Sequence, residues 1–308
     1  MLWLVTALLG LDTRLKTARL LFVTDARAKT KDLAAFMGDA ISGGVDIVQL
    51  SDSSLSNKAE IAALTALRKA AQPRQAIVAV SADADLAGTF GADMLVLPDD
   101  GSSAAEARRR LHRWALIGRS CHTRADIDVA LADDDVNFLI VTADLSTVEY
   151  AAAKAPQGDP ASKPWFAAGG ITVDYLDALV AAGCRRVVVG RALARSTDPL
   201  AEASDFADEL RRAWTADPAM EAVTLAAFGR SASASGDGSG GELPDAPDAG
   251  DGFGSLSNPF KNAKATPPAS GLKLPDPLDA PASTAPQTRK AAKPATETAK
   301  PKKAPKGQ

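Results

Sequence analysis

Short apolar runs alternate with amphipathic helical patterns over residues 19–214 of the chain. Each run is rich in Val, Ile, Leu and Ala with few polar interruptions, which is typical of parallel strands covered on both faces. A segment with apolar residues at helical spacing follows each run. The predicted strands are LLFVTD (20–25), DIVQLSD (46–52), AIVAVS (76–81), MLVLP (94–98), ALIGRSC (115–121), FLIVTA (138–143), PWFAAGGI (164–171) and RRVVVGRAL (185–193).

Eight strand–helix units in this order predict an α/β fold, a compact (β/α)8 TIM barrel. An open, doubly wound parallel sheet is the alternative. The nucleotide-binding form of that sheet carries a GxGxxG turn after its first strand. The first predicted strand here has no such turn, which favours the barrel.

The pattern divides the chain into four parts. Residues 1–18 start with MLWLVTALLGL and predict a short helical segment; this apolar run is shorter than the roughly 20 residues needed to span a bilayer. Residues 19–214 form the predicted barrel, and residues 215–230 a short helical linker. Residues 231–308 are rich in Pro, Ala, Ser and Gly without apolar periodicity, which predicts a disordered tail.

Charge and composition limit the classes of molecule that we expect the protein to bind. The chain has a net charge of −3, so no overall basic field favours nucleic acid, and we expect no specific nucleic-acid or membrane binding. The last part of the tail is rich in Lys and is a candidate contact for an acidic partner. Two cysteines exclude a disulfide framework and favour a cytoplasmic protein, and two histidines exclude a three-histidine metal site. The sequence leaves the oligomeric state open.

The active site of such a barrel lies at the carboxyl ends of the strands, so polar and glycine residues there are the candidates. Gly169 and Gly170 follow the seventh strand, and Gly190 and Arg191 follow the eighth. Glycine lets backbone N–H groups approach an anion, and the dipole of a following helix favours negative charge. These two loops predict a phosphate-binding site.

Other strand ends offer candidates for metal and acid–base chemistry. Asp99 and Asp100 follow the fourth strand and present the oxygen ligands that Mg²⁺ prefers, or else form a solvated turn. Ser120 and His122 follow the fifth strand, and His122 is a candidate general acid or base. Cys121 would be a nucleophile only if its thiolate were stabilised.

Several segments resemble, in the same order, the motifs of thiamine-phosphate synthases and their thiazole tautomerase relatives. GGVDIVQLSDS (43–53) is similar to GGVxxVQLRxK. The other similar pairs are LLFVTD with LYLVTD, GADMLVL (91–97) with GADGVHL, IGRSCHT (117–123) with IGVSTHT, PWFAAGGIT with PVVAIGGI, and VVGRALARSTDP (188–199) with VVRAIxxAxDP. The resemblance covers the whole predicted barrel and implies the same fold.

The resemblance also implies an activity. The family enzyme is a transferase of thiamine biosynthesis that joins a hydroxymethylpyrimidine diphosphate to a thiazole phosphate and releases pyrophosphate. Mg²⁺ and cationic side chains hold the departing charge. The positions that match the family's substrate-binding residues are Gln49, Ser51, Ser53, Ser81, Ser120, Gly169, Gly170, Gly190 and Arg191.

The chain departs from the family where the diphosphate and the metal would bind. Ser51 and Ser53 stand at the motif Arg and Lys, and Ser81 and Ala82 stand at a family Asn-Asp pair. A second metal aspartate falls on Gly101, directly after the two aspartates named above, and the family's glycine-rich loop after strand six is replaced by IVTADLSTVEY. Serine donates a hydrogen bond but does not neutralise a phosphoryl oxygen.

Three functions are therefore open. The first is a divergent synthase that holds Mg²⁺ with Asp99 and Asp100. The second is a noncatalytic barrel that binds a small phosphorylated ligand or acts as a scaffold. The third is a tautomerase-like isomerase with His122 as its base. Fold analogy alone does not choose among them.

Overall fold

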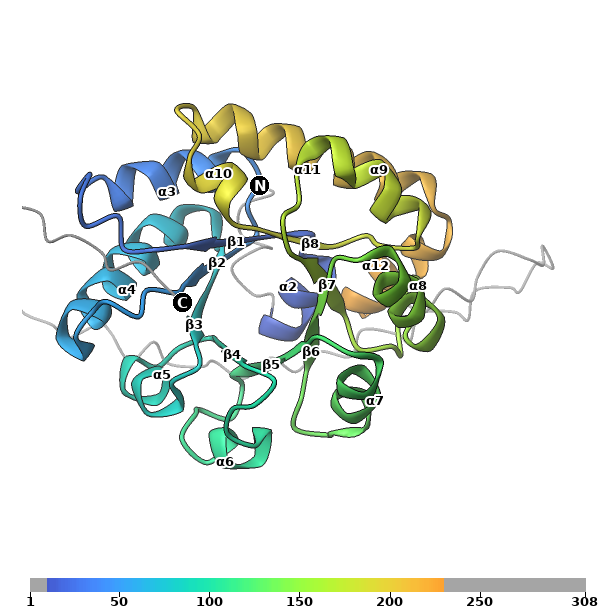
Figure 1. Cartoon of the computed structure of the whole chain (residues 1–308), viewed down its shortest axis with the longest axis horizontal. Helices are drawn as coiled ribbons and strands as arrows, with labels where there is room; N and C mark the ends of the chain where they lie inside the picture. The colour runs from blue at the N-terminus through green and yellow to red at the C-terminus, as the bar shows by residue number, and fades with distance from the viewer. Residues whose placement is uncertain (1–9, 230–308) are drawn as a thin grey trace, which may run out of the picture. The chain divides into compact units, whose positions relative to one another are not determined.

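The computed structural model describes residues 10–229, and the predictions for residues 1–9 and for the tail lie outside this range. Eight parallel strands close into a barrel in sequence order, so the predicted (β/α)8 fold is confirmed (Figure 1). The strands are β1 (Leu20–Thr24), β2 (Ile47–Leu50), β3 (Ile77–Ser81), β4 (Met94–Leu97), β5 (Leu116–Cys121), β6 (Phe138–Thr142), β7 (Trp165–Ala168) and β8 (Val187–Val189).

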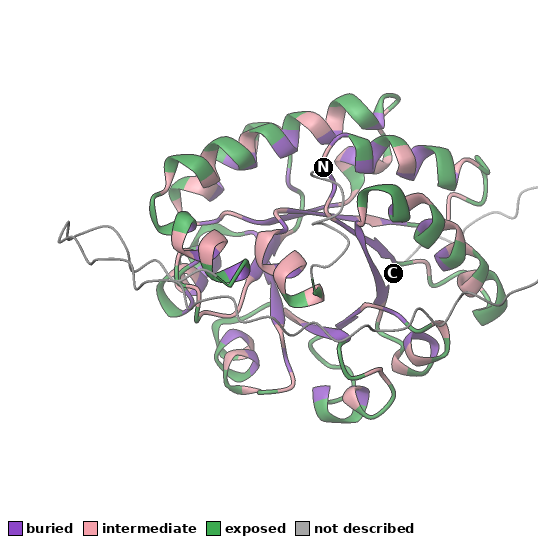
Figure 2. Ribbon diagram, turned by 180° about the vertical axis from the view of Figure 1, so that it is seen from behind, coloured by how far each residue is buried: buried purple, intermediate pink, exposed green. Residues whose placement is uncertain are grey.

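Helices surround the strands and turn their exposed faces outward (Figure 2). Most begin at a Ser, Thr or Asp whose side chain accepts a backbone N–H, for example Ser103 before α6 and Thr123 before α7. The helices of this ring are α3 (Leu33–Ser42), α4 (Asn57–Ala71) with the 3-10 turn Gln72–Arg74, α5 (Ala84–Phe90), α6 (Ala104–Arg108), α7 (Arg124–Ala132), α8 (Leu145–Lys154), α9 (Val173–Ala181), α10 (Arg191–Ala194) and α11 (Pro199–Ala216).

Alternate residues of each strand fill the inside of the barrel. Leu21 pairs in register with Ile47, and Ile47 with Ile77, so their side chains form one layer. Gly118 leaves room for a neighbour: a Cβ there would lie 2.2 Å from the Phe138 ring, which occupies that space. The interior is thus a packed core, and chemistry is confined to the ends of the strands.

The amino-terminal end of the barrel is covered by α2 (Leu11–Thr17), which lies within the ring of strands in both views (Figures 1 and 2). Leu15 is buried among the interior side chains. Buried Arg186 donates to the Lys16 carbonyl at 2.8 Å, and Thr13 donates to the Ala227 carbonyl of α12 (Ala219–Ala227) at 3.0 Å. No helix among residues 10–229 is long and apolar enough to cross a membrane.

Candidate functional site at the mouth of the barrel

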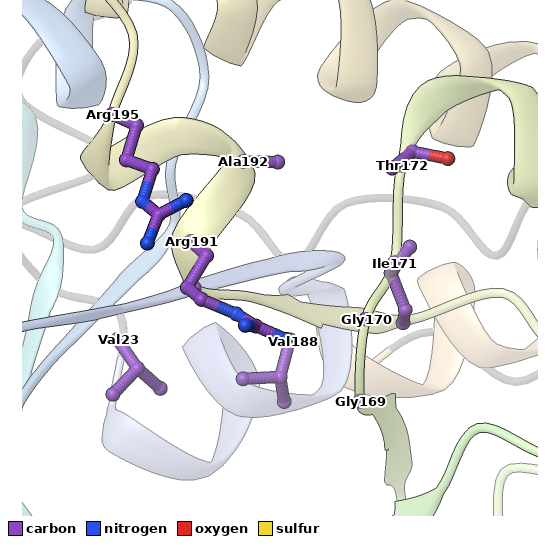
Figure 3. A pocket seen from close by; sticks show the side chains of 10 residues that line it. Val23, Gly169, Gly170, Ile171, Thr172, Val188, Arg191, Ala192 and Arg195 are labelled. Carbon is purple, nitrogen blue, oxygen red and sulfur yellow. The ribbon is translucent and has the colours of Figure 1, made fainter.

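A cavity of about 560 Å³ opens at the carboxyl ends of β1, β7 and β8 (Figure 3). Val23 and Val188 contribute apolar surface to it. Gly169–Gly170 and Gly190–Arg191 line it from two separate loops. The structure therefore brings together the four residues from which the sequence predicts a phosphate site.

The glycine loop after β7 depends on backbone conformations that other residues avoid. Gly169 has φ +128° and Gly170 has φ +65°. A Cβ at Gly170 would meet no atom within 4 Å, so the space beside its backbone is open to a ligand. Glycine here serves both the turn and the close approach of an anion.

The helices after the two loops differ from the expectation of two helix dipoles. Helix α9 has nine residues, and its N-cap, Thr172, makes no side-chain cap hydrogen bond. Helix α10 has only four residues, too few for a substantial dipole. Its contribution comes instead from two guanidinium groups, those of Arg191 and Arg195. Sequence reasoning missed Arg195, although its spacing of four from Arg191 places both on one face of a helix.

Gln49 places an unpaired acceptor in the barrel. Its side chain is 7% exposed, and its Nε2 donates to Ser81 Oγ at 2.7 Å. Its Oε1 has no hydrogen-bond partner among the described residues. A buried acceptor left unpaired costs about 1–3 kcal/mol, so a ligand N–H that reached this oxygen would recover that energy.

The serines at the family's cationic positions are exposed. Ser51 and Ser53 lie in the loop after β2, and the Ser51 N–H donates to the Thr24 carbonyl at 2.9 Å. Hydrogen bonds from Ser54 and from the backbone of Ala26 hold the nearby Asp52 carboxylate and lower its pKa. The loop is thus ordered by an acidic side chain, and neither serine brings a positive charge.

His122 connects the loops after β4, β5 and β6. Its Nδ1 lies 3.2 Å from Thr142 Oγ1 and its Nε2 lies 3.9 Å from Asp99 Oδ2. The imidazole is 62% exposed. Ser120 is half-buried, one residue before the end of β5. The histidine therefore lies among three loops at the mouth of the barrel.

The residues at the mouth do not fit the family's metal. Asp99 and Asp100 are exposed in a turn. No group of three His, Cys, Asp or Glu side chains that could hold a metal occurs among residues 10–229. Ala82 has no ligand atom in its side chain, and Gly101 has no side chain. Mg²⁺ binding at the two aspartates remains a prediction.

On β5, Arg119 has a role that the sequence did not predict, and Cys121 has surroundings that bear on its predicted chemistry. Arg119 donates to the carbonyls of Pro98 and Ser102 at 2.7 and 2.8 Å and so fixes the loop that carries the two aspartates. Burial raises the pKa of Cys121 to about 12. A thiol with that pKa is protonated at neutral pH, which argues against Cys121 as a nucleophile.

The family model described as thiamine monophosphate synthase matches residues 20–193, more than half of the chain. The chain belongs to this family. A thiamine-phosphate synthase of Thermobifida fusca is 39% identical over 209 residues, which cover 64% of this chain and 94% of that protein. One of Streptomyces avermitilis is 36% identical over 208 residues, covering 65% and 97%. The resemblance expected from the sequence is therefore confirmed.

Solved structures support the same fold. The thiamine phosphate pyrophosphorylase of Pyrococcus furiosus matches with a TM-score of 0.58, 17% identity, and coverage of 66% of this chain and 99% of that one. The protein is thus a thiamine-phosphate-synthase-like barrel, and its sequence has Ser51 and Ser53 where the resemblance leads us to expect Arg and Lys.

Proposed function

We propose that this member of the thiamine monophosphate synthase family binds a thiazole- or thiamine-type phosphate ester at the mouth of its barrel, and that it has little or no synthase activity. The observation that supports this is the contrast between two sides of the mouth. The ends of β7 and β8 carry open glycine loops and arginines, whereas the ends of β2 and β3 carry neither a cation nor a metal ligand at the family positions.

On the first side, the phosphate would lie against Gly169–Gly170 and Gly190–Arg191. The open space beside Gly170 allows backbone N–H groups to donate to phosphate oxygens. The apolar surface of Val23 and Val188 adjoins these loops and suits the ring of the ester. A ring amine reaching the unpaired Oε1 of Gln49 would fix the orientation.

On the second side, at the ends of β2 and β3, a departing pyrophosphate would contact the hydroxyl groups of three serines and the methyl group of Ala82. Ser51 and Ser53 donate single hydrogen bonds, and Ser81 already accepts one from Gln49. Removing one preorganised donor from a transition state costs about 3–4 kcal/mol. The family reaction would lose several such groups here.

The binding part of the proposal is tested by ligand-induced thermal stabilisation. Thiamine phosphate and thiazole phosphate should raise the melting temperature of the full chain without Mg²⁺. Gly170→Val should abolish the effect, because its side chain fills the anion's approach. Gly91→Val is the matched control, since Gly91 has φ +66°, also faces open space, and ends α5 away from the cavity.

The comparison of the two glycine variants separates loss of binding from loss of stability. Both variants carry the same backbone strain, about 1–2 kcal/mol or more for a left-handed residue with a side chain. If folded Gly170→Val were stabilised by thiamine phosphate as strongly as Gly91→Val, the phosphate would not bind at the loops after β7 and β8. No stabilisation of the parent chain by either phosphate ester would refute the proposed function.

A tautomerase-like isomerase is the second candidate, supported by the position of His122. Thr142 at its Nδ1 and Asp99 near its Nε2 would orient the imidazole as a base. This function needs no diphosphate leaving group. It predicts solvent deuterium uptake into a carboxylated thiazole phosphate, measured by NMR, that His122→Asn eliminates; no uptake by the parent chain would exclude it.

A further inference from the structure

We propose that Arg191 and Arg195 form a second anion subsite next to the glycine cup, the backbone of Gly169, Gly170 and Gly190. The cavity then prefers a diphosphate ester to a phosphate monoester. This inference rests on the proposed function, in which the cup itself holds one phosphate group. It adds the chemical class of the ligand: an ester with two linked phosphates and an apolar ring.

The two arginines stand at the two ends of one short helix and line one cavity. Arg191 is the first residue of α10 and Arg195 is its C-cap, and both line the cavity that Gly169 and Gly170 line from the opposite loop. Figure 3 shows the Arg191 side chain extending toward Val188 and Gly170, and the Arg195 guanidinium on the side of α10 that faces Val23. A group bound at the glycine loops thus has Arg191 beside it, and Arg195 lines the same cavity farther from those loops.

These guanidinium groups differ from that of Arg27, which contacts the same short helix. Among the described residues, neither Arg191 nor Arg195 has a recorded side-chain hydrogen bond or ion pair. Arg27, by contrast, pairs with Asp32 and donates to the Ala194 carbonyl at 3.0 Å, at the end of the same helix. Arg27 therefore fixes the end of α10, while Arg191 and Arg195 remain available to a ligand.

The composition of the cavity fits a highly charged anion. Its lining includes two arginines and no Asp or Glu. Backbone N–H groups can meet the first phosphate, but the additional charge of a second needs cations, and a guanidinium matches phosphate oxygens in a bidentate geometry. A volume of about 560 Å³ leaves room for more than one phosphate group.

The subsite is distinct from the region where the family resemblance places a diphosphate. That region lies at the ends of β2, β3 and β4, around Ser51, Ser81 and Gly101. In the closed strand order, β7 and β8 lie opposite β3 and β4, and β1 separates β8 from β2. Neither Ser51 nor Ser53 lines the cavity, so serine at these positions takes no cation from the second subsite.

The experiment compares thiamine diphosphate with thiamine phosphate, and inorganic pyrophosphate with inorganic phosphate, by isothermal titration calorimetry. The full chain is used in EDTA at fixed ionic strength, so that no metal contributes. Thiamine diphosphate should bind at least about tenfold more tightly than thiamine phosphate, as expected for one or two solvent-exposed charge-assisted contacts. Arg195→Gln should reduce this preference to about threefold or less, and Arg195→Lys should restore part of it.

Arg113→Gln is the matched control, because this substitution removes the same charge far from the cavity. Arg113 is exposed in the segment before β5, at the other end of the barrel. It should leave the preference unchanged. Equal affinities for the two thiamine esters, or a preference that Arg195→Gln does not reduce, would overturn the second subsite while the proposed function stands. Failure of both esters to bind would overturn both.

Discussion

Restoring the family's charges at the mouth should restore synthase activity, and the structure allows the size of the effect to be worked out. The perturbation is the variant Ser51→Arg, Ser53→Lys, Ser81→Asn, Ala82→Asp. If the missing groups together cost about 6–8 kcal/mol of transition-state stabilisation, allowing for non-additivity, the parent chain is slower than an ordinary enzyme by a factor of about 10⁴–10⁶. From a median turnover of about 10 s⁻¹, the expected rate is about 10⁻³ s⁻¹ or less.

The local structure is compatible with these changes. Ser51 and Ser53 are exposed, so longer side chains displace no core atoms. Ala82 has φ +62°, a conformation that Asp tolerates better than most residues, so Ala82→Asp is not expected to strain the backbone further. An amide oxygen at position 81 can still accept the hydrogen bond from Gln49.

The assay is the coupling of the two precursors by purified protein at millimolar Mg²⁺. The variant should exceed the parent by at least about a hundredfold, the equivalent of about 2.7 kcal/mol. The double variant Ser51→Arg, Ser53→Lys adds the charges without the metal ligand and should gain less. A parent turnover above about 0.1 s⁻¹, within a hundredfold of the enzyme median, would refute the reasoning. Asp99 and Asp100 would then be the first residues to test for the diphosphate site.

Two further predictions concern the interior of the barrel. Gln49→Leu should leave the free protein's stability nearly unchanged, because it removes an unpaired acceptor together with one hydrogen bond. It should weaken the binding of thiamine phosphate about tenfold by calorimetry, and leave the binding of thiazole phosphate unchanged because that ligand lacks the pyrimidine amine. Equal losses for both ligands would contradict this. Gly118→Ala should lower the free energy of unfolding by about 1–3 kcal/mol in urea titrations, because its Cβ would overlap the Phe138 ring. Adding Phe138→Leu should recover part of the loss, and no recovery would show that the overlap is not the cause.

The strands could be predicted from sequence because their signal is local. Continuous apolar runs such as FLIVTA report burial on both faces, and the observed β6 spans Phe138–Thr142. Helix α6 ends at Arg108, whereas the apolar pattern AAEARRRLHR extends to Arg113. The helix ends before its apolar pattern does, because the residues between Arg108 and the start of β5 must turn back toward the barrel.

The contacts across the mouth could not be predicted in the same way. The hydrogen bond from Gln49 to Ser81 joins residues 32 positions apart, and it depends on the register of β2 against β3. The link from Arg119 to the loop after β4 likewise depends on which way a strand residue points at the rim. Such contacts follow from the closed barrel and leave no periodic trace in the sequence.

The residues at the mouth fall into two kinds, those that the fold also needs and those that it does not. Gly170 has a left-handed conformation that the turn after β7 requires, so it serves the fold as well as the approach of an anion. The guanidinium groups of Arg191 and Arg195 and the unpaired Oε1 of Gln49 stabilise no element of the described barrel. A buried acceptor without a partner lowers stability, and two neighbouring cations repel each other. A ligand that carries an N–H donor at one end and phosphate at the other relieves both costs, which is the physical reason to expect binding even where the chemistry of the family is lost.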